Sequence, residues 1–600
     1  MSFPKKPVDN VRSAKTPEEV LSRIREVFGD AVSAELRERK GGKEDRTGFY
    51  DAWLSVPKEE FLNLVDTLAE FDFPQFHVIS GNDDGDVVTL YYHFTIFQVA
   101  GRGKRMGVNV SVPVDKKDLV MPSLFSRIPG VEYSERETRE MFGVDFDGLP
   151  NKALIFLPEN WNESVKPWRR DEAGPSAGDV RELSWEDKSM EKKYKVPIGP
   201  VHVGLKEPIT AWLDLEGEKI VGATVRPGAI HRGIEFMARD RNPIQVIYLS
   251  ERICGICSFA HVVSFLRAVE DAASIPVPPR AQYIRALVLE LERLHSHMLW
   301  AGVACYTIGF DSAFHLGMIL RERVMDVLEV LSGNRVNYGV ATVGGVRWDV
   351  TAELAKTVKD MVKYYKKEFS PFYDVVTADP IAKARLRDVG VLTYEEAIAH
   401  SAVGPTVRAS GVRADLRESS PYEAYVDFGV KAVVPQDYYG KAYGDVFDRF
   451  LVRVHEVYQS LDIIEKVMEG LPEGDIMWEK NLNKVLAYLK KAEGTGMSSI
   501  EAPRGDDTHV VHLDGGDENV TWWKVRAPTY ANAVSWPLMF RNNELADAPL
   551  IINSIDPCIS CMERMLVTDA SSGDQKVVTR TELLEKCREK TRRLMQNDRN

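Results

Sequence analysis

The sequence predicts a multidomain protein, in which an N-terminal α/β two-layer domain precedes a mainly α-helical domain with small peripheral sheets. Three observations predict this class. Helical stretches alternate with short strand-like runs early in the chain, a segment rich in charged and small residues follows, and long amphipathic stretches dominate the remainder. The expected parts are residues 1–168, a linker at 169–192, a mainly helical part at 193–564 and a C-terminal extension at 565–600.

The first part combines two kinds of periodicity. Apolar residues at helical spacing predict helices, and apolar alternation over short runs predicts strands. The predicted helices are Pro17 to Phe28 and Pro57 to Phe71, and the predicted strands are Phe76 to Ser80, Val87 to Gln98 and Lys104 to Val114. We therefore expect a sheet with helices layered against it.

The linker and the long helices follow. Residues 169–179 are rich in charged and small residues and cannot bury much surface, which is typical of a linker. Beyond it, the predicted long helices are Pro279 to Thr307, Ala313 to Leu331, Thr351 to Phe369 and Asp445 to Glu469. They predict a helical bundle. A short, strongly charged helix is expected at Thr581 to Met595.

Composition excludes several classes of protein. The chain has 600 residues, of which 44% are hydrophobic and 28% charged, as in soluble globular proteins. The net charge of −13 argues against nucleic acid or anionic lipid as the main target. No apolar run reaches the roughly 18 residues of a membrane span, and the N-terminus lacks the apolar core of a signal peptide. We therefore expect a cytosolic protein, and its six cysteines fit that reducing compartment.

Four cysteines stand in two C-x-x-C pairs, Cys254 with Cys257 and Cys558 with Cys561. This pattern predicts a four-thiolate metal site. The pairs are too far apart for a zinc ribbon, whose pairs lie within roughly 20 residues of each other, so they can meet only if a large domain folds around them. Four thiolates suit zinc, an iron–sulfur cluster or a thiophilic metal such as nickel, and the spacing alone does not choose among these.

The residues around the pairs give further information about the metal. Residues 252–261, Arg-Ile-Cys-Gly-Ile-Cys-Ser-Phe-Ala-His, and 556–564, Asp-Pro-Cys-Ile-Ser-Cys-Met-Glu-Arg, resemble the two nickel-binding motifs of [NiFe]-hydrogenase large subunits. A zinc or disulfide staple would need neither Asp556, Arg564 nor the spacing of His261. The resemblance implies that Cys254 and Cys558 are terminal ligands of nickel. It also implies that Cys257 and Cys561 bridge nickel to an iron that carries CO and cyanide.

A second resemblance lies in the N-terminal part. Residues 135–150, with 157–161 and 167–171, are similar to the signature of the 30-kDa subunit of respiratory complex I. That subunit partners the 49-kDa subunit, a relative of hydrogenase large subunits. The fusion of the two resembles the large subunits of group 4 membrane-bound [NiFe]-hydrogenases of the formate hydrogenlyase type. The charged run Glu135-Arg136-Glu137, taken alone, is typical of a solvated helix face.

The resemblance extends to catalytic residues near the second pair. Splitting dihydrogen heterolytically needs a soft metal and a nearby base, and the expected proton acceptor is the thiolate of Cys558 or else an outer base. Arg504, in the sequence Glu-Ala-Pro-Arg-Gly-Asp-Asp-Thr-His, resembles the family's arginine above the metal pair. Without the cysteines this segment reads as a surface turn. Asp556 is expected to pair with Arg504 or fix the cysteine loop, the alternative being a cap for the turn before Cys558.

Glu207 is the expected first proton carrier. It lies in residues 199–208, Gly-Pro-Val-His-Val-Gly-Leu-Lys-Glu-Pro, which resemble the opening motif of the catalytic domain. The alternative is an exposed glutamate before a proline. In complex I relatives this stretch reads closer to His-Pro-Ala-Thr-His-Gly, and the departure counts against quinone chemistry.

Several histidines have weaker assignments. His261 is expected to hydrogen-bond the first cysteine loop or the bridging thiolate, or else to be a buried structural histidine. Glu292 and His295 share one face of a predicted helix and favour packing or an ion pair, while His297 faces another side. Cys305 reads as a core residue.

The remaining cysteines bear on the partners. Only Cys305 and Cys587 remain beside the two pairs, too few for an iron–sulfur cluster, so electrons must leave through another subunit. The resemblance implies a small [4Fe–4S] subunit, antiporter-like membrane subunits, and formate dehydrogenase, CO dehydrogenase or ferredoxin as donor, on the cytoplasmic face of the membrane. It also implies nickel-insertion proteins and a maturation endopeptidase that cleaves between Arg564 and Met565.

We therefore expect the catalytic subunit of an energy-converting [NiFe]-hydrogenase complex, which reduces protons to dihydrogen or runs the reverse reaction. Two alternatives remain. One is a related complex I-like oxidoreductase subunit that reduces quinone or polysulfide. The other is a noncatalytic assembly subunit with a four-cysteine zinc site, which metal analysis would distinguish.

Overall fold

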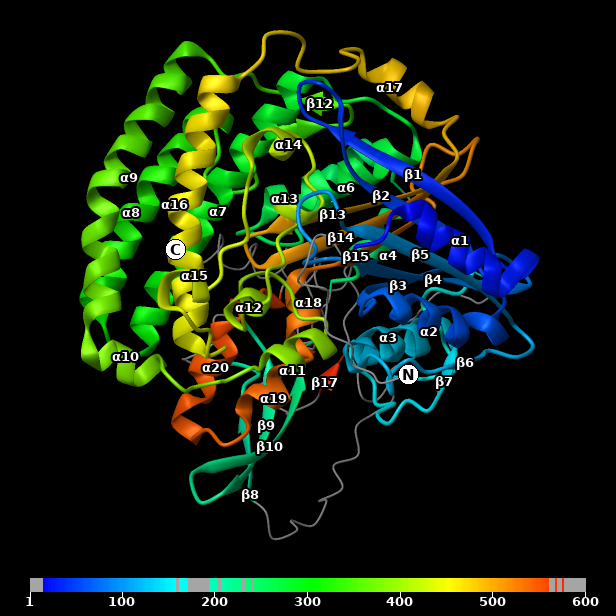
Figure 1. Cartoon of the computed structure of the whole chain (residues 1–600), viewed down its shortest axis with the longest axis horizontal. Helices are drawn as coiled ribbons and strands as arrows, with labels where there is room; N and C mark the ends of the chain where they lie inside the picture. The colour runs from blue at the N-terminus through cyan, green and yellow to red at the C-terminus, as the bar shows by residue number, and fades with distance from the viewer. Residues whose placement is uncertain are drawn as a thin grey trace, which may run out of the picture.

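The computed structural model describes residues 14–157, 161–170, 194–202, 205, 207–227, 232–239, 241–559, 567–568 and 575–576. Figure 1 shows the N-terminal part, in blue and cyan, on one side of a larger body of long green and yellow helices. The α/β part and the mainly helical part predicted from the sequence are both present. The predicted linker beyond residue 170 and the predicted helix at Thr581 to Met595 lie outside the described residues.

A five-stranded sheet forms the centre of the N-terminal part, in the order β1-β2-β5-β4-β3, with β2 and β5 parallel and the other neighbours antiparallel. Helix α2 buries Leu64, Val65 and Leu68, and α1 begins at a capping box formed by Thr16 and Glu19. The elements are α1 (Pro17–Phe28), β1 (Ser33–Gly41), β2 (Arg46–Ser55), α2 (Phe61–Phe71), β3 (Gln75–Asp83), β4 (Val87–Ile96) and β5 (Met106–Asp115).

Strands β1 and β2 are absent from the elements predicted by periodicity. Strand β1 carries charged residues on both faces, so it shows no apolar alternation. Two of its arginines contact the helical part instead. Arg37 donates to the backbone oxygen of Thr495 at 3.0 Å, and Arg39 pairs with Asp271. The charges on β1 thus serve a contact between the domains, which local periodicity does not reveal.

Helix α3 (Glu132–Phe142) carries the charged run of the complex I resemblance, and this run is buried rather than solvated. Glu135 accepts hydrogen bonds from the hydroxyl of Ser123 at 2.6 Å and the backbone N–H of Leu124 at 2.8 Å. Glu137 pairs with Lys524 of the helical part at 2.6 Å. The run therefore holds together remote segments of the chain. Two short parallel strands flank the helix, β6 (Val120–Pro122) and β7 (Asp145–Asp147).

Four long helices pack side by side in the helical part (Figure 1). They are α7 (Pro279–Thr307), α8 (Asp311–Ser332), α9 (Ala352–Ala378) and α16 (Val446–Gly470). The predicted helices match them, except that α9 runs past the predicted end at Phe369 and contains Pro371. Phe372 and Val376 are buried and continue the apolar face of the helix, which offsets the roughly 3 kcal/mol cost of an internal proline.

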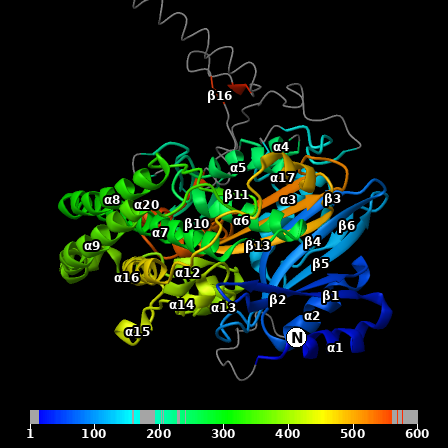
Figure 2. The same cartoon turned by 90° about the horizontal axis from the view of Figure 1, so that it is seen from above.

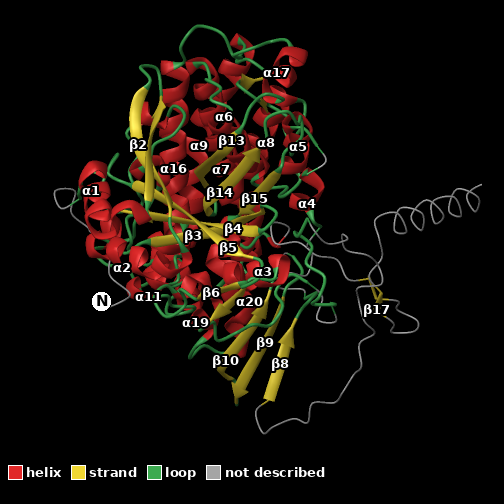
Figure 3. Ribbon diagram, turned by 90° about the vertical axis from the view of Figure 1, so that its right-hand side faces the viewer, coloured by secondary structure: helices red, strands yellow, loops and turns green. Residues whose placement is uncertain are grey.

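Helix α6 (Ser258–Ala272) lies against the sheet formed by β13 (Gly494–Ala502), β14 (Gly505–Leu513) and β15 (Trp522–Arg526). Figure 2 shows these strands between the helices and the blue strands of the N-terminal sheet. A second small sheet, β8 (Tyr194–Ile198), β9 (Thr210–Glu216) and β10 (Lys219–Arg226), lies at one end of the molecule, as Figure 3 shows. The sheet of β13, β14 and β15 is thus placed to connect the two domains.

Shorter elements complete the described chain. The helices are α4 (Ile234–Ala238), α5 (Pro243–Glu251), α10 (Pro380–Leu386), α11 (Tyr394–Ala399), α12 (Gly404–Ala409), α13 (Leu416–Ser419), α14 (Tyr425–Phe428), α15 (Gln436–Tyr439), α17 (Leu482–Leu489), α18 (Pro528–Ala533), α19 (Trp536–Phe540) and α20 (Ala548–Ser554). The strands are β11 (Ala341–Thr342), β12 (Gly345–Val346), β16 (Val567–Thr568) and β17 (Gln575–Lys576).

The buried apolar residues form two main clusters. One lies among the long helices and includes Cys254, Cys257 and Cys558. The other joins the N-terminal sheet to β9, β10 and the segment from α18 to α20. The two domains therefore share a core. Among the helices of the described residues, none is both long and apolar enough to cross a lipid bilayer.

Candidate metal centre

Two cysteines from opposite ends of the helical part meet inside it. Cys254 follows α5, and Cys558 follows α20; both are buried and free of disulfides. Their sulfur atoms lie 3.0 Å apart. This is well beyond a disulfide bond of about 2.05 Å. The fold thus brings two thiols to a common point.

Cys257 joins this cluster at the start of α6. It is buried and occupies the N-cap position, where the positive end of the helix dipole favours a thiolate. The backbone N–H groups of Ile256 and Cys257 both point at the sulfur of Cys254, at 3.3 Å. Cys561, Arg564 and Met565, which the sequence analysis also assigns, lie outside the described residues.

Glu292 of α7 caps helix α6 directly behind the cysteine pair. Its carboxylate accepts from the backbone N–H of Phe259 at 2.7 Å and of Ala260 at 2.9 Å. Burial, followed by the nearby Cys257, raises the pKa of Glu292 well above its usual value, although the two backbone donors oppose this. Sequence analysis favoured packing or an ion pair for this residue, and the contacts give it a capping position instead.

Arg504 lies in the turn between β13 and β14 and is 2% exposed, so the segment is not a surface turn. Its Nε donates to the backbone oxygen of Asp556 at 2.7 Å, and Nη2 lies 3.1 Å from Asp556 Oδ1. Burial lowers the pKa of Arg504, but Asp556 and the three cysteines raise it well above its usual value overall. The guanidinium is therefore a fixed positive charge beside the thiols.

Close packing fixes the turn that carries Arg504. Gly505 has a φ of +127°, and a Cβ atom there would lie 2.7 Å from the backbone nitrogen of Gly404. Only glycine fits both the backbone conformation and the space. The hydroxyl of Ser296 accepts a further hydrogen bond from Arg504, at 3.2 Å. Close packing thus fixes the backbone next to Arg504, and hydrogen bonds fix its guanidinium group.

His261 belongs to a buried cluster with Asp507 and His509 of β14. His261 Nδ1 lies 3.1 Å from Asp507 Oδ2 and 3.2 Å from His509 Nε2. Burial lowers the pKa of His261, but Asp507 and Cys257 raise it well above its usual value overall. The sequence analysis missed the partners. Their spacing of two residues on a strand, which puts both on one face, could have revealed them.

These three groups could hold a metal ion by proximity, since their ligand atoms lie within 4.8 Å of one another. The proton positions argue otherwise. Trp523 donates its indole N–H to His509 Nδ1 at 3.2 Å, so a neutral His509 carries its own proton on Nε2, the atom that faces Asp507 at 3.3 Å. The cluster is therefore better suited to orient His261 than to bind a metal.

Glu207 lies beside the second cysteine segment. Its carboxylate accepts a hydrogen bond from the backbone N–H of Ile559, the residue after Cys558. The side chain is partly exposed, whereas Ile559 and Cys558 are buried. Thr529 also holds this segment, because its hydroxyl accepts from the N–H of Cys558 at 2.9 Å. Glu207 thus connects the cysteine cluster with the solvent side.

The other sequence candidates lie apart from one another. His295 Nε2 is 3.0 Å from the hydroxyl of Tyr338, and His297 Nε2 is 2.8 Å from Glu456, on another side of α7. Cys305 is buried in the helical core, where burial raises the pKa of its thiol to about 12. These residues form no common site, as the helical spacing predicted.

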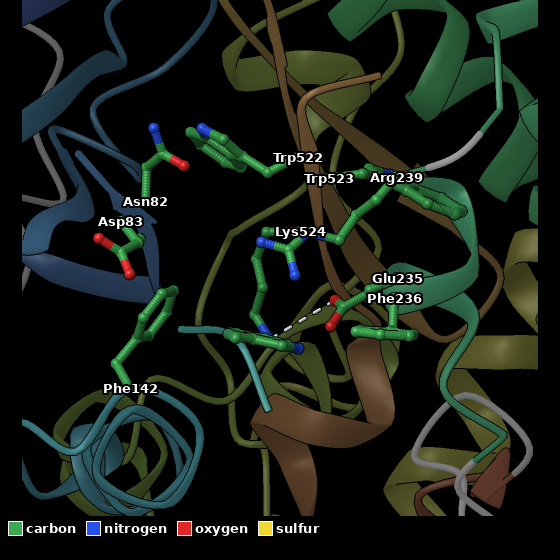
Figure 4. Close-up of a pocket in the computed structure, with 11 residues that line it drawn as sticks. Asn82, Asp83, Phe142, Glu235, Phe236, Arg239, Trp522, Trp523 and Lys524 are labelled. Carbon is green, nitrogen blue, oxygen red and sulfur yellow. Dashed lines mark ion pairs between the residues drawn. The ribbon is translucent and has the colours of Figure 1, made fainter. Parts of the chain in front are cut away.

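The cysteine cluster fits a thiophilic metal. Its donors are buried soft thiols, and the adjacent guanidinium and helix N-terminus compensate negative charge. The pocket shown in Figure 4 lies elsewhere, at the junction with the N-terminal domain, where Lys524 pairs with Glu235. The fold and the thiol cluster together are those of a metal-thiolate protein, with the thiols held inside a mainly helical domain.

Family models match three stretches of the chain. Residues 232–301 match the nickel-dependent hydrogenases, 307–564 the 49-kDa subunit of respiratory-chain NADH dehydrogenase, and 54–177 its 30-kDa subunit. The first stretch contains the first cysteine pair and Glu292, and the second contains Arg504 and the second pair. The family models thus match this chain to both nickel-dependent hydrogenases and the two complex I subunits.

Named relatives cover most of the chain. The membrane-bound hydrogenase subunit alpha of Pyrococcus furiosus is 44% identical over 412 residues, which are 68% of this chain and 96% of the relative. Formate hydrogenlyase subunit 5 of Escherichia coli is 36% identical and covers 84% of this chain and 88% of its own length. The chain belongs to the large, catalytic subunits of membrane-bound nickel-dependent hydrogenases, in the group with a fused complex I 30-kDa-like domain.

A solved structure supports the fold. A chain of the membrane-bound sulfane sulfur reductase, an archaeal respiratory membrane complex, matches with a TM-score of 0.57 and 31% identity. The match covers 62% of this chain and 98% of that one. The Pyrococcus furiosus relative is named as membrane-bound, and the solved chain is part of an archaeal respiratory membrane complex.

Proposed function

We propose that this chain interconverts protons and dihydrogen at a nickel–iron centre held by its two cysteine pairs. The observation that carries the proposal is the meeting of the Cys254 and Cys558 sulfurs, 3.0 Å apart, beside the buried charge of Arg504. Thiolates so placed suit a soft metal, and the arginine favours negative charge that develops next to it.

The residues that would hold the centre are Cys254, Cys257, Cys558 and Cys561, and the centre would contain nickel and an iron with CO and cyanide. When bound, this centre supplies the soft Lewis acid that splits dihydrogen heterolytically. His261 is proposed to orient Cys257, because the pKa of His261 responds to that thiol and Asp507 holds its ring. Asp556 is proposed to fix Arg504.

Proton transfer is proposed to run from Cys558 to Glu207 and on to solvent. The carboxylate of Glu207 is bound to the N–H of Ile559, next to the thiol, and is partly exposed. A carboxylate with one side toward a buried base and another toward water is placed to pass a proton.

Glu207→Gln is expected to lower kcat roughly 10²- to 10⁴-fold, because the amide cannot carry a proton. Glutamine can still accept the N–H of Ile559, so the loop and the metal content are expected to stay unchanged. The measurement is dihydrogen production together with nickel analysis of the same sample. A Gln variant with wild-type kcat would refute the assignment of Glu207.

Glu292→Ala is expected to destabilise the start of α6, where Cys257 lies. Two buried backbone N–H groups lose their acceptor, and each loss lowers the free energy of unfolding by about 1–3 kcal/mol. The thermal midpoint and the nickel content should both fall. Glu292→Gln, which keeps one acceptor oxygen in place, is the matched variant and should lie between Ala and wild type. Equal values for Ala and Gln would mean that capping is not the function of this side chain.

Electrons are proposed to leave through a small [4Fe–4S] subunit. The chain has too few cysteines for a cluster of its own. Gly255, between Cys254 and Cys257, is exposed, so the candidate centre lies directly beneath the surface. Exposed Tyr248, Val336 and Trp348 belong to segments near this loop and suit a protein partner.

Further partners are proposed from the family. Antiporter-like membrane subunits would anchor the complex at the cytoplasmic face, and nickel-insertion proteins and an endopeptidase cutting between Arg564 and Met565 would complete maturation. The domain boundaries at 168, 192 and 564 stay predictions. The proposed electron sources are formate, through a formate dehydrogenase, CO, through CO dehydrogenase, and ferredoxin, and the relatives include both a formate hydrogenlyase subunit and a carbon monoxide-induced hydrogenase.

The test is infrared spectroscopy of the anaerobically purified complex, combined with nickel and iron analysis and a dihydrogen assay. Metal-bound CO and cyanide bands with equimolar nickel and dihydrogen turnover are expected. Zinc without such bands would refute the proposal in favour of an assembly subunit. Reduction of quinone or polysulfide without dihydrogen turnover would refute it in favour of the related oxidoreductases.

A further inference from the structure

Strand β14 presents consecutive residues to two different parts of the molecule. Asp507 and His509 face His261 on α6, next to the candidate metal centre. Asp506 and Thr508, on the opposite face, point to the N-terminal domain and to Arg526. Strand β14 begins at Gly505, and Arg504 is the residue directly before it. A single strand therefore touches the metal side, the arginine and the fused domain.

His77 of β3 is a direct contact between the N-terminal domain and this strand. Its Nδ1 lies 2.8 Å from Asp506 Oδ2 and 2.7 Å from Nη2 of Arg526, and its Nε2 lies 2.6 Å from the hydroxyl of Thr95. All of these side chains are buried. Burial lowers the pKa of His77 to about 4, although Asp506 opposes this, so the ring is neutral at pH 7.

Arg526 of β15 completes the contact. Its Nη2 lies 3.1 Å from Asp506 Oδ2 and donates to the hydroxyl of Thr508 at 3.2 Å, and Nη1 donates to the backbone oxygen of Asp506. A buried ion pair is tolerated only where hydrogen bonds satisfy its remaining groups, and that requirement fixes the geometry. Here His77, from the N-terminal domain, adds a polar contact to both Asp506 and Arg526.

A second contact reinforces the same sheet. Lys524 of β15 pairs with Glu137 of α3 at 2.6 Å and with Glu235 of α4 at 3.5 Å, and it lies 4.9 Å from the ring centre of Trp168. Figure 4 shows Lys524 between Phe142 of the N-terminal domain and Glu235 of the helical part. The N-terminal domain thus contacts β14 through the buried His77 ring and β15 through the buried carboxylate of Glu137.

We propose that His77 of the fused N-terminal domain is a positioning residue for the metal centre, acting through Asp506 to hold β14 and with it Arg504 and the partners of His261. The inference rests on the proposed function for its effect on catalysis, but the clamp itself does not depend on the metal. A shift of β14 moves the guanidinium and the histidine partners together, because they share its backbone. Displacements of about 1 Å at such groups can cost up to roughly 10² in rate.

The test compares His77→Phe with His93→Phe. His93, of β4, is equally buried in the same sheet, but its hydrogen bonds go to Ser80 and Asn109 of the N-terminal domain. Both changes remove ring nitrogens from the sheet, so both should lower its thermal stability. Only His77→Phe is expected to raise amide hydrogen exchange over residues 500–513 in the purified complex. His77→Gln, which restores a polar partner for Asp506, should return the exchange toward wild type.

The infrared bands, kcat and nickel content of the same variants are then measured. His77→Phe is expected to shift the infrared bands and to lower kcat about tenfold, equivalent to about 1.4 kcal/mol, at unchanged nickel content. His93→Phe should keep wild-type bands and kcat. Equal exchange and equal bands in the two Phe variants would overturn the inference. Wild-type protein without bands would refute the proposed function, while the exchange comparison would still decide whether His77 clamps the strand.

Discussion

Cys558→Ser is expected to abolish nickel binding and hydrogenase activity. The thiol of Cys558 lies 3.0 Å from that of Cys254, so both point at the same proposed metal position. Serine is similar in shape but offers a hard, protonated oxygen that suits a soft metal poorly. Loss of an outer-shell partner costs about 10- to 100-fold in metal affinity, and the loss of a direct ligand should exceed that. Nickel analysis of the purified complex measures it.

Cys305→Ser is the matched control. Cys305 is as buried as Cys254 and lies in α7 of the same helical part, away from the cluster. We expect this variant to keep its nickel and to lose only some stability, because a hydroxyl is buried in an apolar place. If both serine variants lost nickel equally, the loss would reflect general destabilisation, and the ligand assignment of Cys558 would fail.

Arg504→Lys is expected to lower kcat by about 10²- to 10³-fold with nickel retained. Lysine keeps a positive charge opposite Asp556, so no buried carboxylate is left uncompensated, a defect that would cost about 3–5 kcal/mol. It lacks the planar fork that binds the backbone oxygen and the carboxylate of Asp556 together. The charge would therefore remain while its position beside the thiols would change.

Arg285→Lys tests whether any buried arginine would give the same result. Arg285 is fully buried and paired with Glu270 at 2.6 Å and Glu423 at 3.1 Å, remote from the cysteine cluster in its contacts. This variant is expected to lose stability with kcat unchanged. A drop in kcat as large as that of Arg504→Lys would contradict a special position for Arg504.

The sequence predicted the elements whose signals are local. Helices at Pro17–Phe28 and Pro279–Thr307 match the predicted bounds, since an amphipathic pattern depends on the residues of the helix alone. The cysteine motifs predicted that residues 254 and 558 meet, and the fold confirms that proximity. Family resemblance, rather than periodicity, identified Arg504 and Glu207 as candidates.

Features made by remote partners could not be predicted in this way. The charged run of α3 looks solvated, but Glu137 finds Lys524 far along the chain. Asp507 and His509 form a cluster with His261 only because β14 packs against α6 in the folded protein. Pro371 ends a helix by local rules, whereas buried Phe372 and Val376 keep α9 going. In each case tertiary packing outweighs local preference.

The continuous apolar core between the N-terminal sheet and the segment from α18 to α20 bears on why the two domains occupy one polypeptide. Separate chains would have to find each other and would expose that apolar surface until they did. A covalent link replaces this encounter by an intramolecular one, at an effective concentration in the millimolar range for short linkers. It also fixes the stoichiometry at synthesis, so every hydrogenase subunit is made with the domain that completes its core.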